Sequence, residues 1–204
     1  MKKWKVVLLF LTISCAKYNG VIDQLYIDYF PVREGMKWIY RTPDSLIVVR
    51  EVLQDTEVSP SLNLVQIEML GDLEYYKKSP DLLALVYEYS KFINGNEVIF
   101  DKADLLLFYQ PVLENQFFTD TMSQIIVLGD TFRYTRVFNS QIIRGTGERR
   151  NLLYAINATL KKGGLEETQS IFAHIVLAPD TGPVYMKKVF DSDTLELYLE
   201  QFLK

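Results

Sequence analysis

Cysteine and histidine, the residue types that most often supply metal ligands and reactive groups, occur once each in this chain, as Cys15 and His174. A zinc site takes several such side chains, and a Ser-His-Asp arrangement would have to use His174. His174 lies in a strand-like run, on the same phase as Phe172 and Val176, which favours a histidine that packs within a strand. The sequence therefore predicts no catalytic residues, no metal site, no cofactor and no enzymatic activity.

Two acidic segments match known motifs only in part. Asp180-Thr181-Gly182 has the triplet of aspartic proteases, but it occurs once, whereas those enzymes use two carboxylates that share a proton. Asp191-Ser192-Asp193 with Glu196 offers oxygen ligands for calcium, yet the glycine and the later glutamate of a calcium loop are missing. We interpret both segments as turns between strands.

A third segment, Gly145-Thr146-Gly147, lacks the Gly-Lys-Ser/Thr ending of a phosphate loop and the helix that follows it. The arginines beside this segment leave open a small anion-binding spot; they are Arg144, Arg149 and Arg150. The simpler interpretation is a hairpin connection between two strands.

The first fifteen residues have the layout of a bacterial lipoprotein export signal. A basic head with Lys2, Lys3 and Lys5 precedes the apolar run Val6–Ile13, and a small residue stands before Cys15. The apolar run has eight residues, whereas a membrane-spanning helix needs about 20. The segment can therefore engage the export machinery but cannot remain as a stable span.

The segment Leu11–Cys15 resembles the bacterial lipobox, in which the cysteine becomes the first residue of the mature chain and its sulfur carries a diacylglycerol. Thr12 stands where leucine is usual, and Leu11 lies one place early. The alternative is ordinary cleavage after Ala16, which would discard the cysteine. Because the chain holds no other cysteine, Cys15 is not half of an internal disulfide. We predict lipidation of Cys15 and contact with a membrane through it.

We expect three parts: a lipoprotein signal peptide over residues 1–14, a tether over residues 15–24 and one antiparallel β domain over residues 25–204. Loss of residues 1–14 lowers the basic residues from 22 to 19 against 26 acidic residues, so the net charge falls from −4 to −7. Nucleic acid favours clustered Lys and Arg, so we expect no nucleic-acid partner.

Alternation of apolar and polar residues dominates the domain. Trp38 and Tyr40 share one phase of one run, and Phe132 and Tyr134 share one phase of another, which indicates strands with one apolar face. Asn94-Gly95 between two such runs is a strong hairpin signal. The predicted fold class is mainly β, a single large curled antiparallel sheet of about eight to ten strands. This sheet forms an open half-barrel, with one or two short helices.

Three segments fit two periods. Residues 81–89 and 104–109 are compatible with buried strands or with short helices, and Leu195–Leu203 fits either period. We predict strand for this last segment because antiparallel strands precede it. An aromatic side of the sheet should not remain in water, so we expect residues 79–115 to cover a concave aromatic face.

Two short motifs near the ends of the domain resemble a group of bacterial envelope lipoproteins of unassigned activity. Tyr29–Tyr40 follows a Tyr-Phe-Pro-x-x-x-Gly-x-x-Trp-x-Tyr start, and Ala178–Val184 follows an Ala-Pro-x-x-Gly-x-Val turn near the end. The resemblance implies an open, curled antiparallel sheet, similar to that of periplasmic lipoprotein carriers. It also implies a lipid-anchored location in the cell envelope, on the periplasmic face or the cell surface, and it implies no reaction.

Two functions of different classes fit these features. The first is a structural or assembly role, in which the domain meets another envelope protein. The alternative is a carrier or binding module for an apolar ligand such as a lipid acyl chain, for which the 13 Tyr and 12 Phe residues supply apolar lining. A filled interior with an exposed apolar patch favours the first function, and a large aromatic pocket favours the second.

Lipidation predicts a defined cell-fractionation result. The full chain should sediment with the membranes, whereas Cys15→Ala should appear in the soluble fraction, because the variant cannot carry the acyl chains that anchor it. A variant that still sediments with the membranes, or a wild-type mature chain that begins at Lys17, contradicts the assignment.

Overall fold

The computed structural model describes residues 27–59, 61–110, 112–191 and 193–204, and within them the regular structure consists of strands. Twelve strands follow one another along the chain. Their bounds are β1 Lys37–Arg41, β2 Ile47–Ser59, β3 Leu62–Met69, β4 Asp72–Lys78, β5 Leu82–Ile93, β6 Asn96–Tyr109, β7 Gln116–Leu128, β8 Asp130–Arg144, β9 Arg150–Lys162, β10 Leu165–Ala178, β11 Gly182–Phe190 and β12 Asp193–Leu203.

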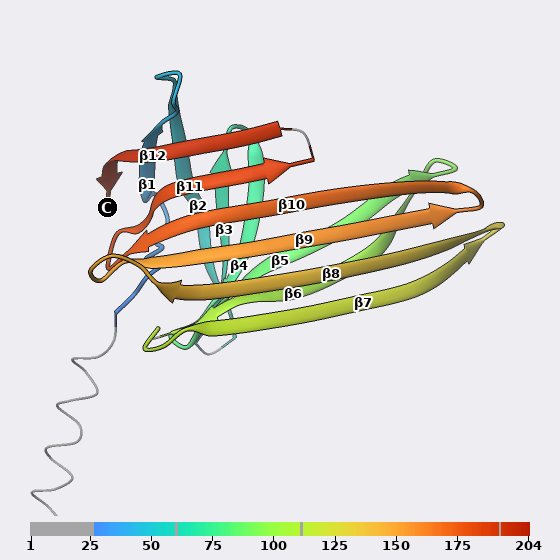
Figure 1. Cartoon of the computed structure of the whole chain (residues 1–204), viewed down its shortest axis with the longest axis horizontal. Helices are drawn as coiled ribbons and strands as arrows, with labels where there is room; N and C mark the ends of the chain where they lie inside the picture. The colour runs from blue at the N-terminus through green and yellow to red at the C-terminus, as the bar shows by residue number, and fades with distance from the viewer. Residues whose placement is uncertain (1–26, 60, 111, 192) are drawn as a thin grey trace, which may run out of the picture.

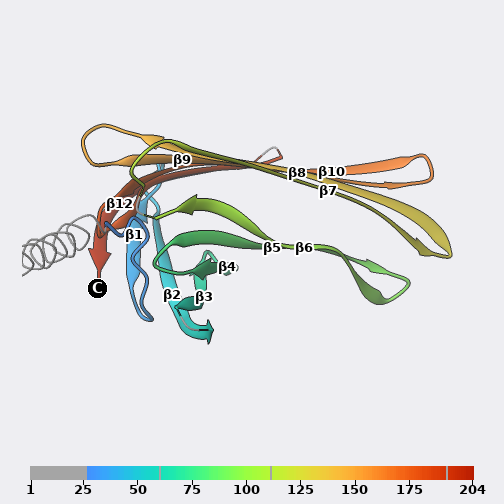
Figure 2. The same cartoon turned by 90° about the horizontal axis from the view of Figure 1, so that it is seen from below.

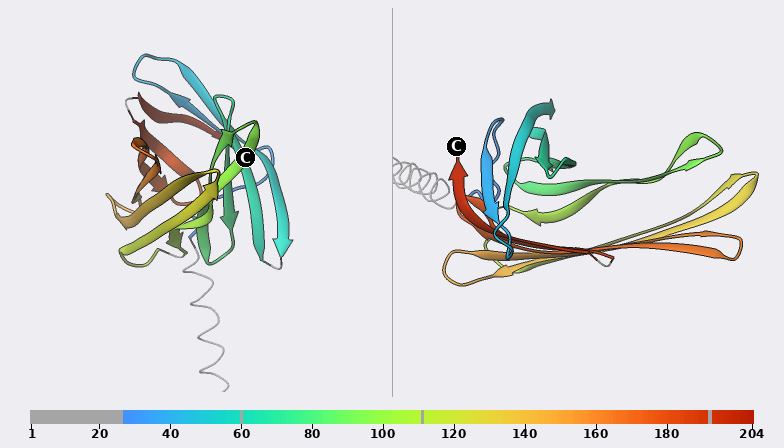
Figure 3. Two further views of the ribbon diagram at one scale, coloured as in Figure 1. Left: turned by 90° about the vertical axis from the view of Figure 1, so that its right-hand side faces the viewer. Right: turned by 90° about the horizontal axis from the view of Figure 1, so that it is seen from above.

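All twelve strands belong to one antiparallel sheet with the order β6-β5-β4-β3-β2-β1-β12-β11-β10-β9-β8-β7. Each neighbouring pair is a hairpin except β1 and β12, which join the two ends of the domain (Figure 1). The sheet curls until β6, at one edge, lies against β7 and β8, at the other edge (Figure 2). Two layers of strands therefore face each other and diverge toward one end of the molecule, as the right-hand view in Figure 3 shows.

This architecture confirms the predicted curled antiparallel sheet, with more strands than the eight to ten expected. The segments 81–89 and 104–109 are parts of β5 and β6, and the described residues contain no helix. Bulges shift the register of this hairpin between Leu83 and Ala84 and between Tyr89 and Ser90. The extra residues, Leu107 and Phe100, both belong to β6. The bulge at Leu107 breaks the period of two within 104–109, which explains why that sequence also fits a helix. The tail is strand β12, as predicted.

The concave face is aromatic, and β5 and β6 cover it as strands of the same sheet. Tyr89 of β5 lies 5.1 Å from Tyr134 of β8, and Phe100 of β6 lies 5.7 Å from Phe132, measured between ring centroids. Such contacts add to the free energy gained by removing the rings from water. The interior is filled by large buried side chains, among them Trp38, Tyr40, Tyr76, Phe108 and Phe138.

Trp38 of β1 fills the end of this core. Its indole nitrogen donates to the carbonyl oxygen of Thr181 at 2.6 Å, which supplies the partner that a buried indole needs. Gly182 has a φ of +82°, and a Cβ there would lie 3.4 Å from the Trp38 ring. Asp180-Thr181-Gly182 therefore forms a turn that packs onto the core, as predicted.

Candidate functional site

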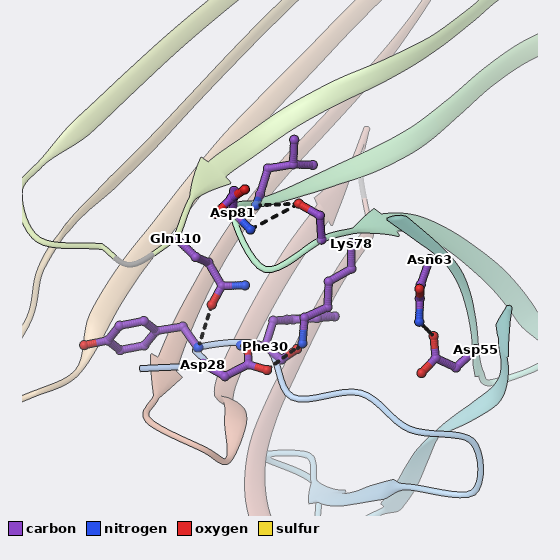
Figure 4. Close-up of polar contacts among 10 residues, drawn as sticks. Asp28, Phe30, Asp55, Asn63, Lys78, Asp81 and Gln110 are labelled. Carbon is purple, nitrogen blue, oxygen red and sulfur yellow. Dashed lines mark hydrogen bonds and ion pairs between the residues drawn. The ribbon is translucent and has the colours of Figure 1, made fainter. Parts of the chain in front are cut away.

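The segment before β1 is fixed to one end of the sheet. Lys78 Nζ lies 2.6 Å from Asp28 Oδ2 and donates to the Phe30 carbonyl oxygen at 2.6 Å (Figure 4). The Tyr29 amide donates to Gln110 Oε1 at 3.3 Å, and the Asp180 amide donates to the Asp28 carbonyl oxygen at 2.9 Å. The described chain thus begins at the end where β4 and β6 finish and where β10 turns into β11.

A charged cluster lies inside the sheet near this end. Arg50 of β2 is completely buried, and its Nη2 lies 2.8 Å from Glu74 Oε2 and 3.0 Å from the Tyr76 hydroxyl, both on β4. Lys188 of β11, which is also buried, contacts the other oxygen of Glu74. The centre of the Arg50 guanidinium lies 5.5 Å from the Phe30 ring centroid and 5.7 Å from that of Tyr76. Glu74 therefore joins two buried basic side chains, and Arg50 packs among aromatic rings.

Burial shifts the proton equilibria of this cluster. Burial first, and then the Arg50 charge, lowers the pKa of Lys188 to about 7. Burial also raises the pKa of Tyr154 to about 12, against the opposing effect of Arg50. These groups fill the space between the two layers with charged and polar atoms, so this part of the interior does not provide an apolar pocket.

A second charged cluster connects the two layers nearer the open end. Arg136 Nε of β8 lies 2.5 Å from Asp101 Oδ2 of β6, and Arg136 Nη2 lies 3.1 Å from Asp120 Oδ2 of β7. The Tyr134 hydroxyl donates to Asp101 at 3.1 Å, and burial raises the pKa of this tyrosine. The cluster holds β6 over β8 and forms part of the wall of a cavity of about 420 Å³ between the edges β6 and β7.

Exposed apolar side chains gather at the opposite end of the molecule. There the turns β5–β6, β7–β8 and β9–β10 lie at the ends of the long strands (Figure 1). Phe92 is 78% exposed and Leu165 is 76% exposed, and Leu128 is also exposed. We call Phe92, Leu128 and Leu165 the tip surface. A cavity of about 400 Å³ opens between Phe92 and Leu165, with Phe132 and Leu160 in its wall.

The sequence motifs occupy other positions. Cys15 lies outside the described residues. His174 is on the outer face, where its Nε2 lies 3.0 Å from Asn151 Oδ1 and its ring lies edge-on to Tyr185. Burial, and then the charge of Lys187, lowers the pKa of His174. Within the part of the chain that the structure describes, no three His, Cys, Asp or Glu side chains are grouped to hold a metal ion.

The arginines at the β8–β9 turn are engaged with the backbone. Arg144 Nη2 donates to the Leu113 carbonyl oxygen at 3.2 Å, and Arg150 Nη2 donates to that of Val112 at 3.2 Å. Two of the three side chains of the anion spot therefore fix the connection between β6 and β7.

Sequence reasoning missed the buried charged clusters. The alternation of residues did contain a sign of these clusters. Arg50 lies on the same strand face as Val48 and Val52, and Arg136 lies on the same face as Tyr134. A charged residue on an apolar phase indicates a buried ion pair, but the sequence does not show which partner it meets.

Comparisons with known proteins give only distant likenesses. No family model matches the chain, and no curated protein matches it.

A crystal structure of a protein from Parabacteroides distasonis, described as a lipoprotein, is similar with 13% identity and a TM-score of 0.43. The likeness covers 87% of this chain and 99% of that one. A protein from Bacteroides fragilis, described as exported and as having a YmcC-like fold, has 13% identity and a TM-score of 0.36, over 87% of this chain and 100% of that one. Among the residues that the structure describes, no helix is long and apolar enough to cross a membrane.

The shared carboxylate of Glu74 predicts an asymmetric mutational response. Glu74→Gln should lower the free energy of unfolding by about 3–5 kcal/mol, because it leaves the buried Arg50 guanidinium without its anion. Glu88→Gln is the matched control, since its partner Lys102 is an exposed side chain, and such pairs contribute about 0–1 kcal/mol. Denaturant unfolding measures both, and equal losses would contradict the role assigned to Glu74.

The lowered pKa of Lys188 predicts how stability changes with pH. Between pH 7 and the ordinary lysine value of 10.5, the unfolded chain holds this proton and the folded chain has released it. The free energy of unfolding should therefore rise from pH 7 to 9, because the unfolded state binds more protons. Lys188→Met should reduce that rise. An unchanged slope, measured by denaturant unfolding at several pH values, would show that Lys188 remains protonated in the fold.

Proposed function

We propose that this protein is a membrane-anchored envelope lipoprotein with a structural or assembly role, and that it acts by binding another envelope protein. The export signal and Cys15 support the location and the anchor. The filled interior supports an interaction role over a carrier role, because large aromatic side chains and two ion-pair clusters occupy the space between the layers.

The tip surface carries this proposal. Its exposed apolar side chains come from three separate hairpins that end together, far from the point where the described chain begins (Figure 1). Exposure of large apolar side chains costs free energy in water, and grouped examples commonly mark protein contacts. A partner that covers Phe92 and Leu165 would recover that free energy, and it would meet the domain clear of the tethered end.

A carrier function is the alternative, and one feature favours it. The cavity at the tip surface is lined in part by Phe132 and Leu160, which are core residues. A small part of an apolar ligand, such as the end of an acyl chain, would fit there. Native mass spectrometry of the protein extracted from its own membranes distinguishes this function, because a carrier retains a lipid in addition to the lipid on Cys15.

The interaction role predicts site-specific crosslinking in cells. A photo-crosslinking amino acid at position 92 or 165 should give an adduct with a second protein, because these side chains form the proposed contact. Position 46 is the matched control, since Leu46 is also apolar and 65% exposed but lies in the β1–β2 turn. The double variant Phe92→Glu/Leu165→Glu should remove the partner from the purified complex and leave the fold intact. Adducts of equal strength at position 46 would refute the tip surface as the binding site.

A further inference from the structure

The two edges of the sheet differ in how well they are protected from other strands. An edge strand exposes unpaired backbone groups, and proteins usually protect it with charges, bulges, proline or side-chain cover. The edge β6 has this protection, with two bulges and with the charged residues Asp101, Lys102 and Asp104.

Side chains from the other layer also bind the backbone of β6. The Gln124 side chain donates to the Phe100 carbonyl oxygen, and the Ser140 hydroxyl donates to that of Leu106 at 2.8 Å. These hydrogen bonds satisfy part of the backbone of β6. The edge β6 is therefore a poor place for a further strand.

The edge β7 lies near β6, whose backbone the side chains of Gln116 and Gln124 reach, but the backbone of β7 itself has little of this protection. Its 13 residues pair with β8 throughout, without a register shift, and they include no proline, glycine or lysine. Asp120 is the one charged residue in the strand. Outward-facing apolar side chains are exposed along it, with Phe117 at 66%, Ile125 at 63% and Val127 at 69%. A long, regular, apolar edge of this kind favours pairing with another strand.

The sequence of β7 is complementary to itself. When two copies pair antiparallel about a two-fold axis at Met122, Phe117 faces Val127 and Phe118 faces Ile126. In the same register Asp120 faces Gln124, so no charge faces a like charge. Apolar residues meet apolar residues on both faces of the sheet, and cross-strand pairs of this type stabilise antiparallel strands.

We infer that two copies of this chain associate through β7, edge to edge, so that their sheets form one continuous sheet. The two-fold axis stands perpendicular to the sheet, and the same patch serves both copies. Phe118, Met122 and Ile126 are only partly buried on the inner side of β7, and each would gain an apolar neighbour from the other copy. This inference does not depend on the tip surface.

Disulfide trapping tests the register. In the paired edges the two Met122 Cα atoms would lie about 4.5–5.5 Å apart, which is within the range of a disulfide. Thr119→Cys is the matched control on the same strand, because its two copies would lie six residues apart, about 20 Å. In native membranes under mild oxidation, Met122→Cys should give at least about tenfold more disulfide-linked dimer than Thr119→Cys. The wild-type chain controls for Cys15.

A second measurement avoids the introduced thiols. The full chain in detergent should sediment with the mass of two chains. Met122→Lys should lower the sedimented mass to that of one chain, because the two introduced lysines would face each other. Thr119→Lys is the control and should lower the mass less than Met122→Lys does, because its lysine would face Ile125 of the other copy. Circular dichroism checks that the variants are folded. Equal disulfide yields at positions 119 and 122, disulfide adducts with another protein, or a monomeric wild type would each overturn the inference.

Discussion

The carboxylate of Glu74, held between Arg50 and Lys188, couples the curvature of the sheet to its stability. In the strand order, β4 and β11 are five neighbours apart, and in a flat sheet that separation would be about 24 Å. Contact between Glu74 and Lys188 exists only because the sheet curls. Removal of these charges from water costs several kcal/mol for each ion, and mutual pairing and the aromatic faces around Arg50 offset that cost. The curl and the cluster therefore depend on each other.

The same dependence recurs toward the open end, where Asp101 of β6 meets Arg136 of β8. These strands are near opposite edges of the sheet, so their ion pair and the aromatic contacts beside it close the two layers onto each other. Closure fills the interior with side chains. The surfaces that we propose for binding consequently lie at the periphery, on the hairpin tips and on the edge of β7.

Alternation along the chain was sufficient to predict a curled antiparallel sheet, the core position of Trp38 and the turn at residues 180–182. These features are local, because side chains of a strand alternate between faces and tight turns need particular residues. The segment 104–109 remained ambiguous, because a bulge at Leu107 of β6 interrupts that alternation. The composition also did not show that the segment covering the aromatic face would be β5 and β6, which are strands of the same sheet.

The sequence by itself predicted the export signal and the anchor at Cys15, and it determined the strand-forming periodicity and the aromatic content. Tertiary structure alone decided which charged residues are paired in the interior, which edge is protected and which apolar residues meet at one end. The physical reason is the range of the interactions. Periodicity and turn chemistry act over a few residues, whereas Glu74 and Lys188 are separated by 114 positions and become neighbours only after the whole sheet has curled.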